Sequence, residues 1–155
     1  MKKMLLIVCL TISTSIFAQN SALVIGGVLD LTVPEAGSAG KALQLVAIDS
    51  IADLSVYAVG VANNGGGTDG IEANLPAVAL APGESFWFLR DSSAYQNYFG
   101  NVFGQYNVNY GINGAVSQNG DDAIELFLIS ANDTTVVDLY GDPATDGSGE
   151  AWEYM

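Results

Sequence analysis

The stretch from Ala52 to Gly70 constrains the fold of this chain more than any other part of the sequence. Its first half alternates with a period of two, which places one set of side chains on each face of a predicted strand: Leu54, Val56 and Ala58 against Ser55, Tyr57 and Val59. Residues 63–70 contain only Asn, Gly, Thr and Asp, and Asn and Gly tolerate the left-handed backbone of tight loops. Residues 138–154 repeat this arrangement, with a strand that opens into an acidic, glycine-rich loop. We therefore expect a sheet protein with two long glycine-rich loops.

Short strands separated by turns account for most of the remaining chain. They are predicted over residues 22–29, 41–48, 75–80, 85–90, 122–130 and 134–140. Residues 91–100 differ, because Asp91 or Ser92 can cap a short helix and Gly100 can end it. Residues 101–120 are predicted to form a long loop. Seven or eight short strands with at most one short helix predict an all-β fold, a sandwich of two sheets.

Residues 1–18 have the features of a secretory signal peptide. Lys2 and Lys3 precede an apolar run, and Ala18 is a small residue at the expected cleavage site. A membrane anchor is the competing interpretation, but the apolar run is shorter than the ~20 residues that a membrane span needs. Residues 19–155 are therefore expected to be an exported domain that is secreted or held at the cell surface, without a membrane segment after cleavage.

The charge and the cysteine content exclude several partners and chemistries. The chain has 17 acidic and 4 basic residues, a formal net charge of −13. Removal of the signal peptide would leave Lys41 and Arg90 as the basic residues, which cannot form the cationic cluster that nucleic acid requires. Cys9 lies within the apolar run of the leader and does not follow a small residue, which argues against a lipoprotein. The exported domain would have neither a disulfide nor a thiol.

Four segments resemble those of a known domain family. They are ADLSVYAVGVANNGGGTDG (52–70), LAPGESFWFL (80–89), NGDDAIELF (119–127) and VVDLYGDPATDGSGEAWEY (136–154). The last is the most specific, since an acidic glycine loop that ends in Trp-Glu-Tyr after Asp-x-Tyr-Gly is unusual. Together they are similar to the lamin tail domain in its secreted bacterial form. The resemblance covers Ala22 to Tyr154 and implies an immunoglobulin-like β-sandwich.

The resemblance also implies a function, a non-catalytic module for binding, adhesion or structural support at the bacterial cell surface. A cell-surface protein or a polysaccharide would be its partner. Family members generally continue past the Trp-Glu-Tyr motif into a further strand, whereas this sequence ends at Met155. Either the sandwich is closed in another way, or its C-terminal strand is missing and leaves an unpaired edge. In the second case, the chain would be a truncated piece of a larger secreted hydrolase of the nuclease or phosphatase type.

No catalytic residues are predicted. The chain has no His, and its one Cys lies in the leader, which excludes His-dependent triads, thiol nucleophiles and zinc sites built from His or Cys. A G-x-S-x-G elbow and a phosphate-binding G-K-S/T motif are also absent. Paired carboxylates could act as acid and base in a glycosidase, but among 17 acidic residues any such pair carries little information. The sequence therefore predicts a protein that is not an enzyme.

Calcium is the one cofactor that the sequence brings into consideration. Its candidate ligands are Asp142, Asp146 and Glu150 on one loop, and Asn119, Asp121 and Asp122 on a second. Calcium binds carboxylate and carbonyl oxygens in irregular geometry. The spacing does not match an EF-hand loop, and an acidic loop surrounded by water is the alternative interpretation.

Aromatic residues crowd one part of the chain, among Asn and Gln side chains. They are Trp87, Tyr95, Tyr98, Phe99, Phe103, Tyr106 and Tyr110. Exposed rings beside amides can stack on sugars or pack against a protein partner. Trp87, Tyr95 and Phe99 are expected in the core. Tyr106 and Tyr110 lie in the predicted polar loop and are the candidate residues for binding a glycan or another surface polymer.

Overall fold

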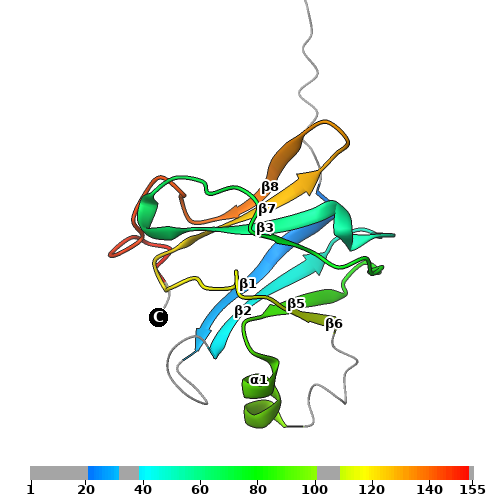
Figure 1. The fold of residues 1–155 in the computed structure, drawn as a ribbon, viewed down its shortest axis with the longest axis horizontal. Helices are drawn as coiled ribbons and strands as arrows, with labels where there is room; N and C mark the ends of the chain where they lie inside the picture. Colours follow the sequence, from blue (N-terminus) through cyan, green and yellow to red (C-terminus); the bar gives the residue numbers. More distant parts are fainter. Residues whose placement is uncertain (1–20, 32–38, 101–108, 154–155) are drawn as a thin grey trace, which may run out of the picture.

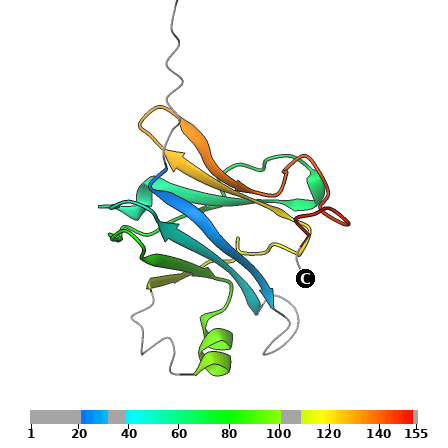
Figure 2. The same cartoon turned by 180° about the vertical axis from the view of Figure 1, so that it is seen from behind.

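The chain folds into a β-sandwich of two four-stranded sheets with one α-helix beside it (Figures 1 and 2). The computed structural model describes residues 21–31, 39–100 and 109–153. The predicted all-β sandwich of two sheets is thereby confirmed. The predicted signal peptide, residues 1–18, lies outside the described residues.

The first sheet has the strand order β1-β2-β5-β6. Its strands are β1 (Leu23–Leu31), β2 (Gly40–Ala47), β5 (Ser85–Leu89) and β6 (Asn109–Ile112). β2 pairs antiparallel with β1 and β5, whereas β5 and β6 run parallel. β5 has a neighbour on each side, which agrees with its almost wholly apolar sequence.

The second sheet has the strand order β4-β3-β7-β8, and all its pairs are antiparallel. Its strands are β3 (Tyr57–Ala62), β4 (Ala73–Asn74), β7 (Ala123–Ile129) and β8 (Thr134–Tyr140). Two 3-10 turns flank β3, η1 (Leu54–Val56) before it and η2 (Asn63–Gly65) after it. β7 and β8, the strands predicted over residues 122–130 and 134–140, pair as an antiparallel hairpin.

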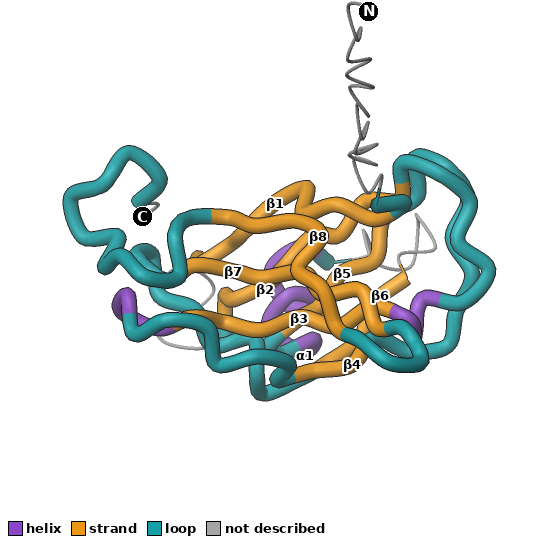
Figure 3. Tube along the Cα trace, turned by 90° about the horizontal axis from the view of Figure 1, so that it is seen from above, coloured by secondary structure: helices purple, strands orange, loops and turns teal. Residues whose placement is uncertain are grey.

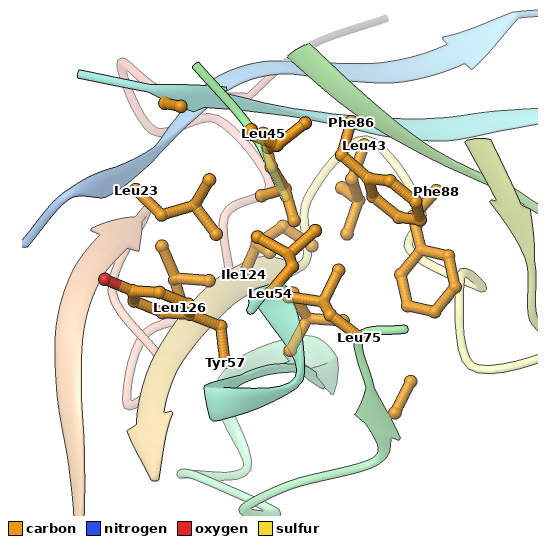
Figure 4. Close-up of a cluster of buried hydrophobic side chains, with 14 of the residues drawn as sticks. Leu23, Leu43, Leu45, Leu54, Tyr57, Leu75, Phe86, Phe88, Ile124 and Leu126 are labelled. Atoms are coloured by element: carbon orange, nitrogen blue, oxygen red, sulfur yellow. The ribbon is translucent and has the colours of Figure 1, made fainter. Parts of the chain in front are cut away.

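The core lies between the sheets and is built from every second side chain of the alternating strands (Figures 3 and 4). Leu43 and Leu45 of β2 point toward Ile124 and Leu126 of β7. The strands predicted over residues 41–48 and 122–130 are therefore confirmed. Among the described residues, the largest fully buried side chains are those of Phe86, Leu23, Leu43, Leu45, Leu54, Leu89, Ile124 and Leu126.

The strand predicted after Ala52 begins later than expected, and a turn before it interrupts the predicted alternation. The Asp53 carboxylate accepts a hydrogen bond from the backbone N–H of Ser55, which stabilises η1 in place of extended backbone. The turn buries Leu54 and restarts the alternation after it. As a result Tyr57 joins the core, whereas Ala58, expected on the face of Leu54, lies on the outer face of the sheet.

Two further strand predictions need correction. The strand expected over residues 75–80 is replaced by β4 at Ala73–Asn74, and only an isolated bridge joins Ile51 and Leu80. Pro76 has no backbone N–H for a ladder, which explains why pairing stops before it. Within the predicted loop 101–120, the structure contains β6, whose short NYGI sequence carries no clear alternation.

The helix α1 (Ser92–Phe99) packs against one end of the outer face of the first sheet (Figure 1). Its predicted cap is confirmed, because the Asp91 carboxylate accepts hydrogen bonds from two backbone N–H groups of the first turn. Hydrogen bonds from Ser93 lower the pKa of Asp91 below its usual value. The ring of Tyr95 is buried against Ala42 and Leu89, which anchors the helix to the sheet.

A side chain joins the sheets at one open side of the sandwich. β1 and β8 are edge strands and lie next to each other. The Asp138 carboxylate accepts a hydrogen bond of 2.7 Å from the backbone N–H of Ile25, at the bulge of β1. This hydrogen bond uses a backbone N–H group of β1 that an uncovered edge strand would leave free to pair with another chain.

Candidate functional site

The two glycine-rich loops identified in the sequence pack against each other at one end of the sandwich, at the left of Figure 1. The backbone N–H of Gly67 donates a hydrogen bond of 2.8 Å to the carbonyl oxygen of Pro143. A Cβ atom on Gly65 would collide with the backbone at Asp146. Asn64 (φ 50°) and Gly65 (φ 68°) adopt the predicted left-handed backbone. We call residues 63–70 and 141–150 together the glycine-loop end.

Asp122 connects the glycine-loop end to the start of β7. Its side chain is fully buried, and its two carboxylate oxygens accept hydrogen bonds from two different loops. One comes from the backbone N–H of Asn64 at 2.9 Å, and the other from the backbone N–H of Asn119 at 2.7 Å. Asp122 therefore acts as a structural acceptor that fixes the position of η2.

Two of the other calcium candidates, Asp142 and Asp146, accept hydrogen bonds from within their own loop. Asp142 accepts from the backbone N–H of Ala144 and from the hydroxyl of Thr145, both at 2.9 Å. Asp146 accepts from the backbone N–H of Ser148 at 3.0 Å. These contacts stabilise the turns of the loop and use oxygens that a metal ion would otherwise bind.

The structure brings the two predicted calcium clusters to the same end of the molecule without merging their carboxylates. The hydroxyl of Ser148 donates to the Asp121 carboxylate at 2.9 Å, while Asn119 accepts from Lys41 and Glu150 is exposed. In the part of the chain that the structure describes, no three Asp or Glu side chains lie close enough to hold a metal ion. Calcium binding stays a prediction from the sequence.

Trp152 folds back onto the glycine-loop end. Its ring lies against Gly141 and Gly147, where a Cβ atom on either glycine would collide with it. The Tyr140 hydroxyl donates a hydrogen bond to the carbonyl oxygen of Trp152, and the two rings meet edge to face at 6.2 Å. The Trp152 ring, packed on Gly141 and Gly147, thus holds the segment after β8 against the glycine-loop end.

A second candidate surface lies where α1 meets β6, at the lower part of Figure 1. The side-chain amide of Gln96 donates a hydrogen bond of 3.3 Å to the hydroxyl of Tyr110. Tyr98 and Phe99 are exposed, and their rings pack edge to face at 4.9 Å. We define the aromatic–amide surface by the following residues: Gln96, Tyr98, Phe99, Tyr110 and Ile112.

The aromatic predictions are met in part. Tyr95 is buried as expected, and Tyr110 reaches the surface. Phe99, expected in the core, is exposed on its outer side because it packs on Tyr95 from the end of the helix. Tyr106 lies outside the described residues.

A polar cluster around Lys41 was not anticipated from the sequence. Lys41 is buried, and its ammonium group contacts the Asp30 carboxylate, the backbone carbonyl of Gln118 and the side-chain oxygen of Asn119. The Gln118 side chain is also buried and donates to the carbonyl oxygens of Leu29 and Ala42. Only the scarcity of basic residues in the chain could have directed attention to Lys41.

Tyr95 gives the fold a dependence on alkaline pH. Burial, with the nearby charge of Asp30 as a smaller cause, raises the pKa of Tyr95 from 10.0 to about 12. Its neutral hydroxyl donates a hydrogen bond of 2.6 Å to the carbonyl oxygen of Gly40. A raised folded-state pKa means that this stabilisation is complete below pH 10.0 and is lost as the pH rises through about 12.

Replacing Tyr95 with Phe tests this dependence. At pH 7 the variant should lose about 1 kcal/mol of unfolding free energy, the net contribution of one hydrogen bond. Above pH 10 the difference in unfolding free energy between wild type and variant should become smaller, because only the wild type has a phenol to ionise at this position. Urea unfolding at a series of pH values measures this difference. A difference that does not change with pH would contradict the raised pKa of Tyr95.

No family model, curated protein or solved structure matches this chain. Within the described residues, no helix has the length and apolar character needed to cross a membrane. The functional argument therefore depends on the two surfaces and on the sequence resemblance.

Proposed function

We propose that the chain is a secreted, non-catalytic module of the lamin tail type that binds an uncharged polysaccharide at the bacterial cell surface. The signal-like leader, the resemblance of four segments to the lamin tail domain, and the absence of His from the chain support this proposal. The two-sheet sandwich is consistent with the fold that the resemblance implies.

The observation that carries the proposal is the character of the aromatic–amide surface. Tyr98 of α1 is 51% exposed, and Ile112 of β6 is 57% exposed. These are large exposed fractions for an aromatic and an aliphatic side chain. Neither α1 nor β6 contains a charged residue, although the whole chain has a net charge of −13. Flat rings flanked by amides, without charge, suit stacking on an uncharged sugar better than binding an ionic ligand.

The replacement of Tyr98 with Ala tests the proposal. The side chain is exposed, so the variant should unfold within about 0.5 kcal/mol of the wild type. Loss of a stacking ring should weaken retention in gels containing soluble uncharged glucans or mannans by about tenfold, which corresponds to roughly 1.4 kcal/mol. Affinity electrophoresis through such gels measures this change.

Leu139 provides the matched control, since it is 44% exposed on β8, in the other sheet. Leu139→Ala removes another partly exposed apolar side chain at a different place and should leave retention unchanged. Equal loss in both variants would mean non-specific adsorption. Unchanged retention in Tyr98→Ala, or no retention of the wild type on any uncharged polysaccharide, would reject the proposed site.

A further inference from the structure

Lys41 and Asn119 are placed to react with each other. The side-chain nitrogen of Lys41 lies 2.9 Å from Oδ1 of Asn119. Because Oδ1 is bonded to Cγ, the carboxamide carbon lies about 3–4 Å from this nitrogen, close to the separation from which a nucleophile attacks. The two residues are 78 positions apart in sequence, so only the tertiary structure brings them together.

The surroundings of the pair suit acyl transfer. Lys41 is 6% exposed, which keeps competing water away from the amine. Asp30, its direct partner across the β1–β2 ladder, holds both carboxylate oxygens 3.4 Å from the same nitrogen and can accept a proton from it. Asn119 is exposed, so a leaving group released from its carboxamide has a path to water.

We propose that Lys41 and Asn119 condense spontaneously into an intramolecular amide bond. Asp30 accepts a proton from the Lys41 ammonium, and the free amine attacks Cγ of Asn119. The bond from Cγ to the side-chain nitrogen of Asn119 breaks, and ammonia departs with the proton that Asp30 returns. The ammonia takes up the remaining proton of the attacking nitrogen and leaves as ammonium. One carbon–nitrogen bond forms and one breaks, and no oxidant or reductant is needed.

The new bond would connect the two sheets covalently. Lys41 belongs to β2 in the first sheet, and Asn119 lies just before β7 in the second. The chain has a single Cys and therefore cannot form an internal disulfide. A cross-link over a long loop restricts the unfolded chain in the way that a disulfide does, so the bond would stabilise an exported domain that lacks one.

Intact mass spectrometry of the purified full chain tests the proposal. The wild type should weigh one ammonia molecule less than its sequence requires, whereas Asn119→Ala and Lys41→Arg should have their full calculated masses. Asn119 is exposed, so its variant should fold even where loss of the buried Lys41 prevents folding. Asn132→Ala, at the exposed turn between β7 and β8, is the matched control and should keep the mass deficit.

Peptide mapping identifies the bond responsible for any deficit. Digestion of the wild type should yield one branched peptide that contains both Lys41 and Asn119. Asn119 precedes Gly120, and ring closure onto that backbone nitrogen would also release ammonia. A deficit that persists in Lys41→Arg, without a branched peptide, would show that ring closure and overturn the proposal. A wild-type mass equal to the calculated mass would overturn it as well and leave Lys41 as a buried ammonium held by three acceptors.

Discussion

Replacing Asp122 with Ala should lower the free energy of unfolding by about 3 kcal/mol, because each hydrogen bond to a buried charged group contributes about 1.5–3 kcal/mol. The fully buried Asp122 carboxylate is the acceptor for the backbone N–H groups of Asn64 and Asn119. Alanine leaves both donors without their acceptor and separates the glycine-loop end from the start of β7. Urea unfolding followed by tryptophan fluorescence measures the change.

Two further variants show whether the hydrogen bonds of Asp122 account for this loss. Asn at position 122 keeps the size but provides one acceptor oxygen in place of two, so it should lose about half as much. Asp121→Ala is the matched control, since Asp121 is only partly buried and accepts a single side-chain hydrogen bond from Ser148. It should change the unfolding free energy by less than about 1 kcal/mol. An Asp122→Ala variant as stable as Asp121→Ala would mean that water replaces the carboxylate at both donors.

Replacing Gly65 with Ala should also cost about 3 kcal/mol, through backbone strain and overpacking together. Gly65 has a φ of 68°, and an added Cβ atom would collide with the backbone of Thr145 and Asp146. The variant must therefore push the two glycine-rich loops apart. Hydrogen exchange should show faster exchange at the backbone N–H of Gly67, which donates to Pro143 across the contact.

Gly67 is the matched control for this experiment. Its φ of 93° carries similar backbone strain, but an added Cβ atom would meet nothing within 4 Å. Gly67→Ala should therefore lose only about 1 kcal/mol, the cost of the backbone conformation alone. If Gly65→Ala and Gly67→Ala were equally destabilising, the contact between the loops would not contribute to stability.

The candidate binding residues were predictable only where local chemistry identifies them. Tyr110 was singled out because it lies among Asn and Gly, and it is found on the surface of β6. The exposure of Tyr98 and Phe99 could not be predicted from the helix pattern alone. The helix contacts the sheet through Tyr95, and Phe99 packs on the ring of Tyr95 rather than on the sheet. Charge identifies the acidic candidates, but it does not reveal that backbone N–H groups already donate to Asp122, Asp142 and Asp146.

The sequence alone determined which segments become strands wherever side chains alternate in period two. In β2 and β7, large apolar residues occupy alternate positions at the centre of each strand, so a single register can bury Leu43, Leu45, Ile124 and Leu126. It also determined the helix, through the cap at Asp91, and the left-handed loop at Asn64 and Gly65. These features depend on interactions within a few residues, which is why local patterns predict them.

Only the tertiary structure decided the parallel pairing of β6 and the contacts of the loops. The turn η1, by contrast, depends on a local hydrogen bond from Ser55 to Asp53, which the period-two pattern does not reveal. β6 has too few residues to show a period and is held as a strand by its pairing with β5. The Lys41 cluster joins residues 78 positions apart, and such contacts form because the packed sheets bring their ends together, which no local pattern encodes.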